Sequence, residues 1–137
     1  MDHVTKAKRS EIMSKVRGRD TKPEMRVRRR LHALGYRYRL QAKELPGRPD
    51  IVFRPRRKAI FVHGCFWHRH EGCRYASTPK TRTEFWEEKF RQNIERDDRN
   101  EKALSKLGWK TLIIWECQLK NADFPLDDVL IQFLEDV

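Results

Sequence analysis

Residues 49–64, with the sequence PDIVFRPRRKAIFVHG, contain two short apolar runs separated by a basic turn. The runs are rich in Val, Ile and Phe, whereas the segment RPRR between them, residues 54–57, carries proline and charge. Short runs of β-branched and aromatic residues on either side of a turn are typical of paired strands. The stretch therefore predicts a β-hairpin whose strands are residues 49–53 and 58–64.

Further strands are predicted on both sides of this hairpin. YRYRLQ, residues 36–41, alternates polar and apolar side chains as a strand does, and AKELPGR, residues 42–48, reads as a turn. WKTLIIWECQL, residues 109–119, is an apolar run of the kind found in buried strands. The sheet should therefore combine strands from both halves of the chain.

The sequence DTKPEMRVRRRLHALGY, residues 20–36, has the signals of an α-helix. Asp20 or Thr21 can cap its first turn, and Pro23 fits within that turn. Gly35 provides the stop signal. The apolar stripe of this helix consists of Val27, Leu31 and Leu34.

The segment from Thr81 to Leu107 predicts one long helix that ends at Gly108. Asp97 falls on its otherwise apolar stripe, which consists of Trp86, Phe90, Ile94, Leu104 and Leu107. LDDVLIQFLEDV, residues 126–137, predicts a closing amphipathic helix. The resulting order αβββαβα predicts a mixed α/β fold with a central sheet flanked by helices.

The chain has 137 residues, which suits one domain with a single core. No apolar run approaches the roughly 20 residues that cross a bilayer, and the N-terminal segment lacks the hydrophobic stretch of a secretion signal. We therefore expect a soluble, cytoplasmic protein with no membrane partner. We expect residues 1–19 to form a basic arm ahead of a single domain that comprises residues 20–137.

Positive charge is concentrated near the N-terminus. The chain has 31 Lys and Arg against 20 Asp and Glu, and residues 1–40 hold 13 of the basic and 4 of the acidic side chains. That segment thus supplies +9 of the formal net charge of +11, whereas residues 116–137 hold six acids and one lysine. A chain polarised in this way favours nucleic acid as its partner. An anionic membrane surface and a merely solvated basic face are the alternatives.

The segment FVHGCFWHRHEGCRY, residues 61–75, concentrates side chains that can bind a metal ion. The odd number of cysteines argues against a disulfide framework, whereas three thiolates and one imidazole suit a tetrahedral structural zinc site. The candidate ligands are Cys65, His70, Cys73 and Cys117. His63 and His68 compete for the fourth position, and buried free cysteines are the alternative to a metal site.

Several acidic residues stand out from their surroundings. Asp50 follows a Pro-Gly turn at the mouth of an apolar strand, which by itself is typical of a turn residue. Glu24 lies on the first predicted helix, and Asp97 lies on an apolar helix stripe, where an acid needs a polar partner. Together with the histidines that follow the second hairpin strand, these acids form a candidate catalytic group.

The stretches LPGRPDIVF, FVHGCFWHRH, TRTEFWEEKF, NIERDDRN and LGWKTLIIWEC together closely resemble the very-short-patch-repair (Vsr) endonucleases. The similarity runs from about Lys8 to Cys117 and implies a restriction-endonuclease-like fold, a variant of the PD-(D/E)xK superfamily, with a structural zinc site. Pro49 and Asp50 match the PD of that signature, but FVHGC stands where the second acid and the lysine would be. The family shares this departure.

The resemblance implies roles for the site residues. Asp50 would bind Mg²⁺ through its carboxylate, and Val62 would contribute only its backbone carbonyl. His68 resembles the general base that activates water, with Asp97 accepting the hydrogen bond of its other ring nitrogen. The residues that position metal-bound water or the phosphate would be His63, Glu24 and Asn93. The ligands of Zn²⁺ would be Cys65, His70, Cys73 and Cys117.

The resemblance also implies how DNA is held. We expect Phe66 and Trp67 to be exposed beside the first zinc ligand and to insert into the base stack as an aromatic wedge. Packing of both rings in the core is the alternative. Met13 of the N-terminal arm would enter the other groove. Basic residues of the arm would bind phosphates and make the affinity salt-dependent, including Lys15, Arg17 and Arg19.

The implied function is Mg²⁺-dependent nicking of double-stranded DNA 5′ to the T of a T:G mismatch, which arises when 5-methylcytosine deaminates. The nick would start very short patch repair. We expect a monomer in the bacterial cytoplasm, associated with the nucleoid when bound to DNA. A cognate C5-cytosine methyltransferase system and mismatch-repair proteins are candidate partners. The alternatives are a related nickase with another mismatch or site choice, and a catalytically inactive zinc-stapled DNA-binding module.

Overall fold

The structure is a computed structural model that describes residues 21–136. The predicted arm of residues 1–19, with Met13, Lys15, Arg17 and Arg19, lies outside the described residues. No helix within the described range combines the length and the apolar character that crossing a bilayer requires.

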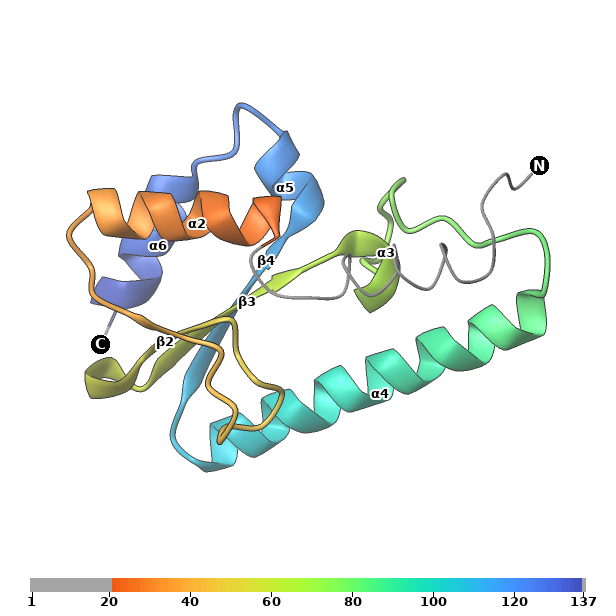
Figure 1. Ribbon diagram of the computed structural model, residues 1–137, viewed down its shortest axis with the longest axis horizontal. Coiled ribbons are helices and arrows are strands. Elements are labelled where there is room, and N and C mark those ends of the chain that lie inside the picture. The colour runs from red at the N-terminus through yellow and green to blue at the C-terminus, as the bar shows by residue number, and fades with distance from the viewer. Residues whose placement is uncertain (1–20, 137) are drawn as a thin grey trace.

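A mixed sheet of four strands forms the centre of the molecule (Figure 1). The strand order is β1-β2-β3-β4, with antiparallel pairing among the first three strands and parallel pairing between the last two. The strands are β1 (Arg39–Leu40), β2 (Ile51–Phe53), β3 (Lys58–His63) and β4 (Lys110–Trp115). The predicted hairpin is confirmed, since β2 and β3 pair with Ile51 opposite Ile60.

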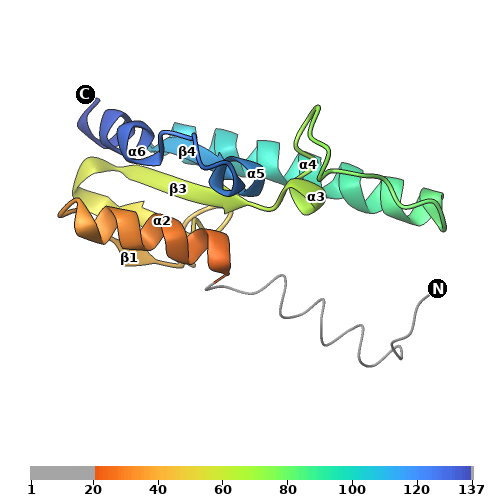
Figure 2. The ribbon, with the colours of Figure 1, turned by 90° about the horizontal axis from the view of Figure 1, so that it is seen from above.

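Helices cover both faces of this sheet. On one face α2 (Lys22–Ala33) and α6 (Leu126–Glu135) lie side by side, while α4 (Thr83–Lys106) crosses the other face (Figure 1 and Figure 2). The short helix α3 (Cys65–His68) follows β3 after a single residue, Gly64, and α5 (Glu116–Lys120) follows β4 directly. The predicted mixed α/β fold, with a sheet flanked by helices, is confirmed.

The larger apolar core lies between the sheet and the pair formed by α2 and α6. Val27 and Leu31 are fully buried there, and Leu34 packs against the same cluster, as the predicted stripe requires. Burial of one such side chain contributes about 1.5–3 kcal/mol. The sheet contributes Ile51, Phe53, Ile60 and Ile114. This layer therefore fixes the strands that border the candidate site.

A buried lysine joins the sheet to the end of α6. Lys58 is 5% exposed, and its Nζ donates hydrogen bonds to the carbonyl oxygens of Phe133 at 2.5 Å, Leu134 at 3.2 Å and Asp136. These carbonyls lie at the helix C-terminus, where the helix dipole favours a cation. The ammonium group therefore caps α6 and holds it against the first residue of β3.

The long helix is confirmed, but part of its predicted buried stripe is wrong. Ile94 and Leu107 are 49% and 52% exposed. Asp97 lies half-buried on the inward side, because this stretch of the helix faces a polar cleft and not an apolar core. The buried residues of α4 are Phe90, Asn93 and Leu104.

The predicted strand over residues 109–119 is too long. β4 ends at Trp115, and Cys117 lies in α5, one turn of helix that begins directly after the strand. The strand predicted over residues 36–41 is likewise reduced to Arg39–Leu40. In both places the sequence pattern that is typical of a strand continues for more residues than can pair with the neighbouring strand.

Candidate active site and metal centre

A cleft with a volume of about 1210 Å³ opens at the end of β3, between the start of α2 and the middle of α4. Side chains of a strand alternate between its two faces, so Val62 packs against the apolar core and the next residue, His63, points into the cleft. The loop before β2 and helix α3 add further polar side chains. The predicted site residues that line the cleft are Glu24, Asp50, Val62, His63, Phe66, Trp67, His68, Asn93 and Asp97.

Two acidic side chains meet in this cleft. Asp50 immediately precedes β2, and Glu24 lies in the first turn of α2, where it is 2% exposed. The Val62 backbone N–H donates a hydrogen bond to Asp50 Oδ2 at 2.8 Å, and the Gln41 side-chain amide donates one to Glu24 Oε1 at 3.2 Å. Burial, reinforced by the neighbouring Glu24 carboxyl, raises the pKa of Asp50 to about 6.

This carboxyl pair fits a hard divalent cation. Two acids held together in a buried place repel one another once both are ionised, and a cation between them removes that cost. Carboxylate and carbonyl oxygens are also the ligands that Mg²⁺ prefers. The hydrogen bond from Val62 brings the backbone of β3 alongside the Asp50 carboxylate, so a backbone carbonyl of this strand could act as a further ligand.

A histidine and an aspartate form a second pair in the cleft. His68 ends α3, Asp97 lies in α4, and His68 Nδ1 is 2.6 Å from Asp97 Oδ2. A carboxylate in this place favours the tautomer that carries its proton on Nδ1, which leaves the lone pair of Nε2 available to accept a proton. Asp97 thus has the polar partner that its position on the helix stripe required.

His63 lies directly against this pair. Its ring stacks on that of His68 with centroids 3.7 Å apart and an interplanar angle of 7°. His63 is 6% exposed, and its Nδ1 has no hydrogen-bond partner within the described part of the chain. Burial, together with the adjacent His68, lowers the pKa of His63 to about 3, so the ring is neutral at physiological pH.

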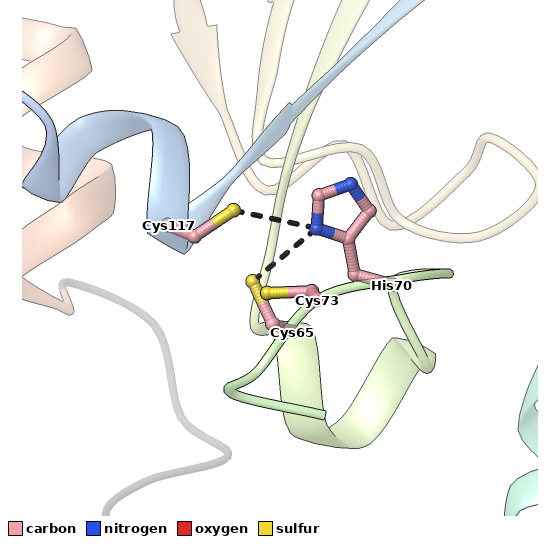
Figure 3. Close-up of side chains that lie close together, drawn as sticks. All are labelled: Cys65, His70, Cys73 and Cys117. Carbon is pink, nitrogen blue, oxygen red and sulfur yellow. Dashed lines mark hydrogen bonds between the residues drawn. The ribbon is translucent and has the colours of Figure 1, made fainter. Parts of the chain in front are cut away.

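Three cysteines and one histidine come together beside the cleft, and we name this group the cysteine-histidine cluster (Figure 3). Its members are Cys65, His70, Cys73 and Cys117. Their ligand atoms all lie within 4.8 Å of one another, and His70 Nδ1 is 3.3 Å from the Cys117 sulfur and 3.7 Å from the Cys65 sulfur. The structure thus places His70 with the cysteines, whereas His63 and His68 lie in the cleft.

The cysteine-histidine cluster could hold a metal ion. Burial raises the pKa of the Cys65 thiol to about 12, and a bound cation would reverse this by stabilising the thiolate. Three sulfur ligands and one imidazole nitrogen form a closed set of the kind found in structural zinc sites. The cluster joins α3 and the turn after it to α5, which follows a different strand.

The sequence matches the family model of the DNA mismatch endonuclease Vsr over residues 1–74, which is more than half of the chain. The matched range contains Glu24 and Asp50, and it contains the cleft histidines His63 and His68. The chain belongs to the Vsr family.

Individual relatives agree with this assignment. The DNA mismatch endonuclease Vsr of Escherichia coli K12 is 46% identical over 131 residues, which cover 96% of this chain and 83% of the relative. The type II nicking enzyme V.XorIIP of Xanthomonas oryzae pv. oryzae is 48% identical over 120 residues, 88% of either chain. The type II nicking enzyme V.NmeAIP of Neisseria meningitidis is 46% identical over 88% of this chain and 85% of its own length. As a Vsr-family member, the chain is a DNA endonuclease.

Asn93 of this Vsr-family protein is occupied by protein contacts. Its Nδ2 donates a hydrogen bond to the carbonyl oxygen of Trp67 at 3.1 Å, and its Oδ1 accepts one from Arg96 Nη2 at 2.8 Å. The buried amide therefore fastens α3 to α4. The predicted contact of Asn93 with a phosphate or with metal-bound water stays a prediction.

Phe66 and Trp67 are half-buried, so the prediction of exposed rings is wrong. Both rings pack against α4. The ring centroid of Phe66 lies 5.2 Å from that of Phe90 and 5.7 Å from that of Trp86, and the ring centroid of Trp67 lies 5.9 Å from that of Trp86. The single turn of α3 directs both side chains at this helix, because Asn93 holds the backbone of Trp67. The alternative of core packing is only partly correct, since both residues also line the cleft.

Three residues at the Vsr-family site escaped the sequence analysis. Gln41 adopts a left-handed φ of 51° and holds Glu24, and the Arg69 guanidinium lies 3.9 Å over the Phe90 ring. Trp115 packs against His70 and His63. All three occur in segments with an ordinary strand or loop pattern, and their partners are distant in the sequence. No local signal marks them.

Proposed function

We propose that the protein is a Mg²⁺-dependent endonuclease that nicks one strand of duplex DNA 5′ to the T of a T:G mismatch left by deamination of 5-methylcytosine. The nick would start very short patch repair. One observation carries the proposal: in a Vsr-family chain, a carboxyl pair and a His-Asp pair line the same cleft. Metal-assisted hydrolysis of a phosphodiester needs a cation site and a base within reach of one phosphate.

His68 is the proposed general base. It takes a proton from water on Nε2 while the water oxygen attacks phosphorus, and the bond from phosphorus to the 3′-oxygen breaks. The 3′-oxygen acquires a proton from solvent, which leaves 5′-phosphate and 3′-hydroxyl ends. Asp97 fixes the ring of His68 and stabilises the imidazolium that forms.

The proposed Mg²⁺ ligands are the Asp50 carboxylate and the Val62 backbone carbonyl. The bound ion would polarise the phosphoryl oxygen and stabilise charge on the leaving 3′-oxygen. Because only a backbone atom is needed at position 62, the valine there can pack its side chain in the apolar core. The proposed positioning residues for water or phosphate are Glu24, His63 and Asn93.

Zn²⁺ is the proposed occupant of the cysteine-histidine cluster, where it would fasten α3 to α5. We further propose a restriction-endonuclease-like domain over residues 20–137, preceded by an arm of residues 1–19. One nick requires one active site, so the protein would act as a monomer. It would work in the cytoplasm, on the nucleoid, alongside a cognate C5-cytosine methyltransferase system and mismatch-repair proteins.

Mismatch selection is proposed to depend on Phe66 and Trp67. Opening a base step for a ring costs a few kcal/mol, and it costs less where pairing is already imperfect. Because both rings pack against α4 in the free protein, insertion would also require them to exchange these contacts for base stacking. Arm residues would complete the grip, with Met13 in the other groove and phosphate contacts from Lys15, Arg17 and Arg19.

A nickase with another mismatch or site choice is the second candidate. Relatives of nearly equal identity are named type II nicking enzymes and a DNA mismatch endonuclease. Cleavage of a library of T:G duplexes with randomised flanks separates the two candidates. Cuts confined to T:G sites support the first, and efficient cuts at other mismatches or at paired sites support the second.

Nicking by the purified full-length protein tests the proposal. T:G, T:A and C:G duplexes are compared in Mg²⁺ and in EDTA, and one cut 5′ to the mismatched T is expected, in Mg²⁺ only. Asp97→Asn should slow that cut by about 10²–10⁴-fold without weakening DNA binding, because His68 loses its orienting acceptor. The matched control is Asp98→Asn, since this exposed neighbour pairs only with Lys102 among the described residues.

Two outcomes would contradict the proposal. Tight binding without cleavage of any duplex would support the catalytically inactive DNA-binding module. Equal cutting of mismatched and fully paired duplexes would remove the mismatch from the proposed function while leaving a nuclease.

A further inference from the structure

We propose that Trp115 is a positioning residue that couples the cysteine-histidine cluster to the histidines of the cleft. The inference rests on the proposed function, because it takes His68 as the base, and it adds a residue that orients this base from the metal side. If the inference is correct, the cysteine-histidine cluster helps to orient the histidines of the cleft and also stabilises the fold.

Four rings follow one another from the cysteine-histidine cluster to the cleft. His70 stacks on Trp115 with centroids 4.1 Å apart and an interplanar angle of 10°. Trp115 meets His63 edge-on, at 5.3 Å and 78°, and His63 stacks on His68. A candidate metal ligand, His70, and the proposed base, His68, are therefore joined by an unbroken series of ring contacts. The last ring, that of His68, is hydrogen-bonded to Asp97.

The backbone fixes Trp115 at this junction. Trp115 is the last residue of β4 and lies in register with His63, the last residue of β3. It is also the N-cap of α5, where its backbone N–H donates a hydrogen bond to Gln118 Oε1 at 2.9 Å. Cys117 follows in the first turn of the same helix. One residue thus ends the strand beside His63 and begins the helix that carries a candidate metal ligand.

Packing, and not hydrogen bonding, holds the Nδ1 side of the His63 ring. This nitrogen is buried and unpartnered within the described residues, so the orientation of the ring depends on the neighbours that it touches. Those neighbours include Trp115, which makes a T-shaped contact with the ring, and His68, which stacks on it. Removal of the indole would therefore free His63, and His68 would lose the surface on which it stacks.

A general role in the apolar core does not account for Trp115. In the described part of the chain it belongs to neither apolar cluster, whereas Trp109 packs against the cluster that contains Ala42, Val52 and Ala59. An aliphatic side chain could fill similar space. Only a flat aromatic group can stack its face on His70 and also make a T-shaped ring contact with His63.

Substitution of Trp115 by Leu and by Phe tests the inference in the full-length, metal-loaded protein. Trp109→Leu is the matched control, because it removes an indole that packs elsewhere. At saturating protein, Trp115→Leu should slow single-turnover nicking of T:G DNA by about tenfold or more, the factor that one lost aromatic contact can cost. The Kd for DNA and the metal content should stay at wild-type values. Trp115→Phe keeps a flat ring and should recover most of the rate.

Two further readouts need no DNA. The proton on His68 Nδ1 should resonate far downfield in the wild type, because its hydrogen bond to Asp97 is short, and it should shift or broaden in Trp115→Leu. Transfer of the metal to a chromogenic chelator should be about tenfold faster in Trp115→Leu, because His70 loses its stacking partner. Neither readout should change in Trp109→Leu.

The inference is overturned if Trp115→Leu nicks at the wild-type rate with an unshifted His68 proton. Equal losses in Trp109→Leu would also overturn it, because they would indicate general destabilisation. If Trp115→Leu does not fold, the proton signal of Trp115→Met against Trp109→Met decides in the same way, because the flexible Met side chain fills space without supplying a flat ring. A wild type that fails to nick would contradict the proposed function, whereas the proton and metal-transfer readouts would still decide the role of Trp115.

Discussion

Asp50 is an acid that the fold holds at a cost in stability. Its pKa rises from 3.8 to about 6 on folding, mainly through burial and then through the neighbouring Glu24. Between these two values the folded chain binds more protons than the unfolded chain. The free energy of unfolding therefore falls as the pH rises from about 4 to 6, and the loss is complete above that range.

Asp50→Asn should consequently make the metal-free protein more stable at neutral pH. The variant cannot ionise and can still accept the hydrogen bond from Val62. We expect its free energy of unfolding at pH 7.5 to exceed that of the wild type by about 1–3 kcal/mol, and the difference to shrink toward pH 4. Urea unfolding in EDTA-free, divalent-free buffer measures it, with the exposed Glu87→Gln as control. A variant that is no more stable at pH 7.5 would contradict this account of the site.

At this scale the sequence predicts which residues gather in the cleft better than how their side chains are arranged there. Asp97 could be found because an acid on an apolar stripe needs a partner, and the motifs pointed to His68 as that partner. Trp115 and Gln41 could not be found, because their contacts with His70 and Glu24 arise only when distant segments pack. The prediction that Phe66 and Trp67 are exposed is wrong for the same reason, since their exposure depends on how α3 packs against α4.

Helix α3 is the element that most needs outside support. It has four residues, too few for a helix that is stable alone, yet it carries His68 and both proposed wedge rings. The cysteine-histidine cluster holds it on one side. On the α4 side, Asn93 donates a hydrogen bond to the α3 backbone and Asp97 accepts one from His68. A metal ion in the cluster would therefore stabilise the segment that presents the proposed base, His68.

Cys73→Ser should lower metal content and stability together. One of the four ligands is lost, so the metal should bind far more weakly, and the free energy of unfolding should fall by more than about 2 kcal/mol. Metal analysis and thermal unfolding measure the two effects, with Ser77→Ala in the same segment as control. A Cys73→Ser protein that keeps a full equivalent of metal and melts with the wild type would disprove the stapling role.

Lys58 offers a test of how α6 is attached to the sheet. Lys58→Met removes the cation that caps the last carbonyls of this helix and should cost about 1–3 kcal/mol of stability. Lys110→Met is the matched control, because that lysine lies opposite Lys58 on β4 and is exposed. Urea unfolding of the two variants compares them. Equal stability of both would mean that the cap contributes nothing.

Elements with local signals were predicted well, and those that depend on neighbours were not. The cap and stripe of α2 and the hairpin of β2 and β3 are written in short stretches of sequence, so they could be recognised in isolation. The end of β4 at Trp115 is set by its pairing with β3, whose last residue is His63. The apolar pattern continues past that point and misled the prediction for Cys117.

The whole molecule gathers its site from both halves of the chain. The parallel pairing of β3 with β4 brings α3 and α5 to the same edge of the sheet, where the cysteine-histidine cluster forms. α4 returns across the opposite face from α2 and supplies Asp97 to the cleft that Glu24 and Asp50 enter from the other elements. The carboxyl pair and the His-Asp pair therefore form one proposed catalytic unit.

A double-mutant cycle on single-turnover nicking of a T:G duplex tests this claim most directly. Asp50→Asn and His68→Gln should each slow the cut by more than about 10²-fold, and the double variant should be no slower than the slower single variant, because residues that act as a unit lose their effect together. Losses that multiply in the double variant would show that the two positions act independently, and would contradict a single site.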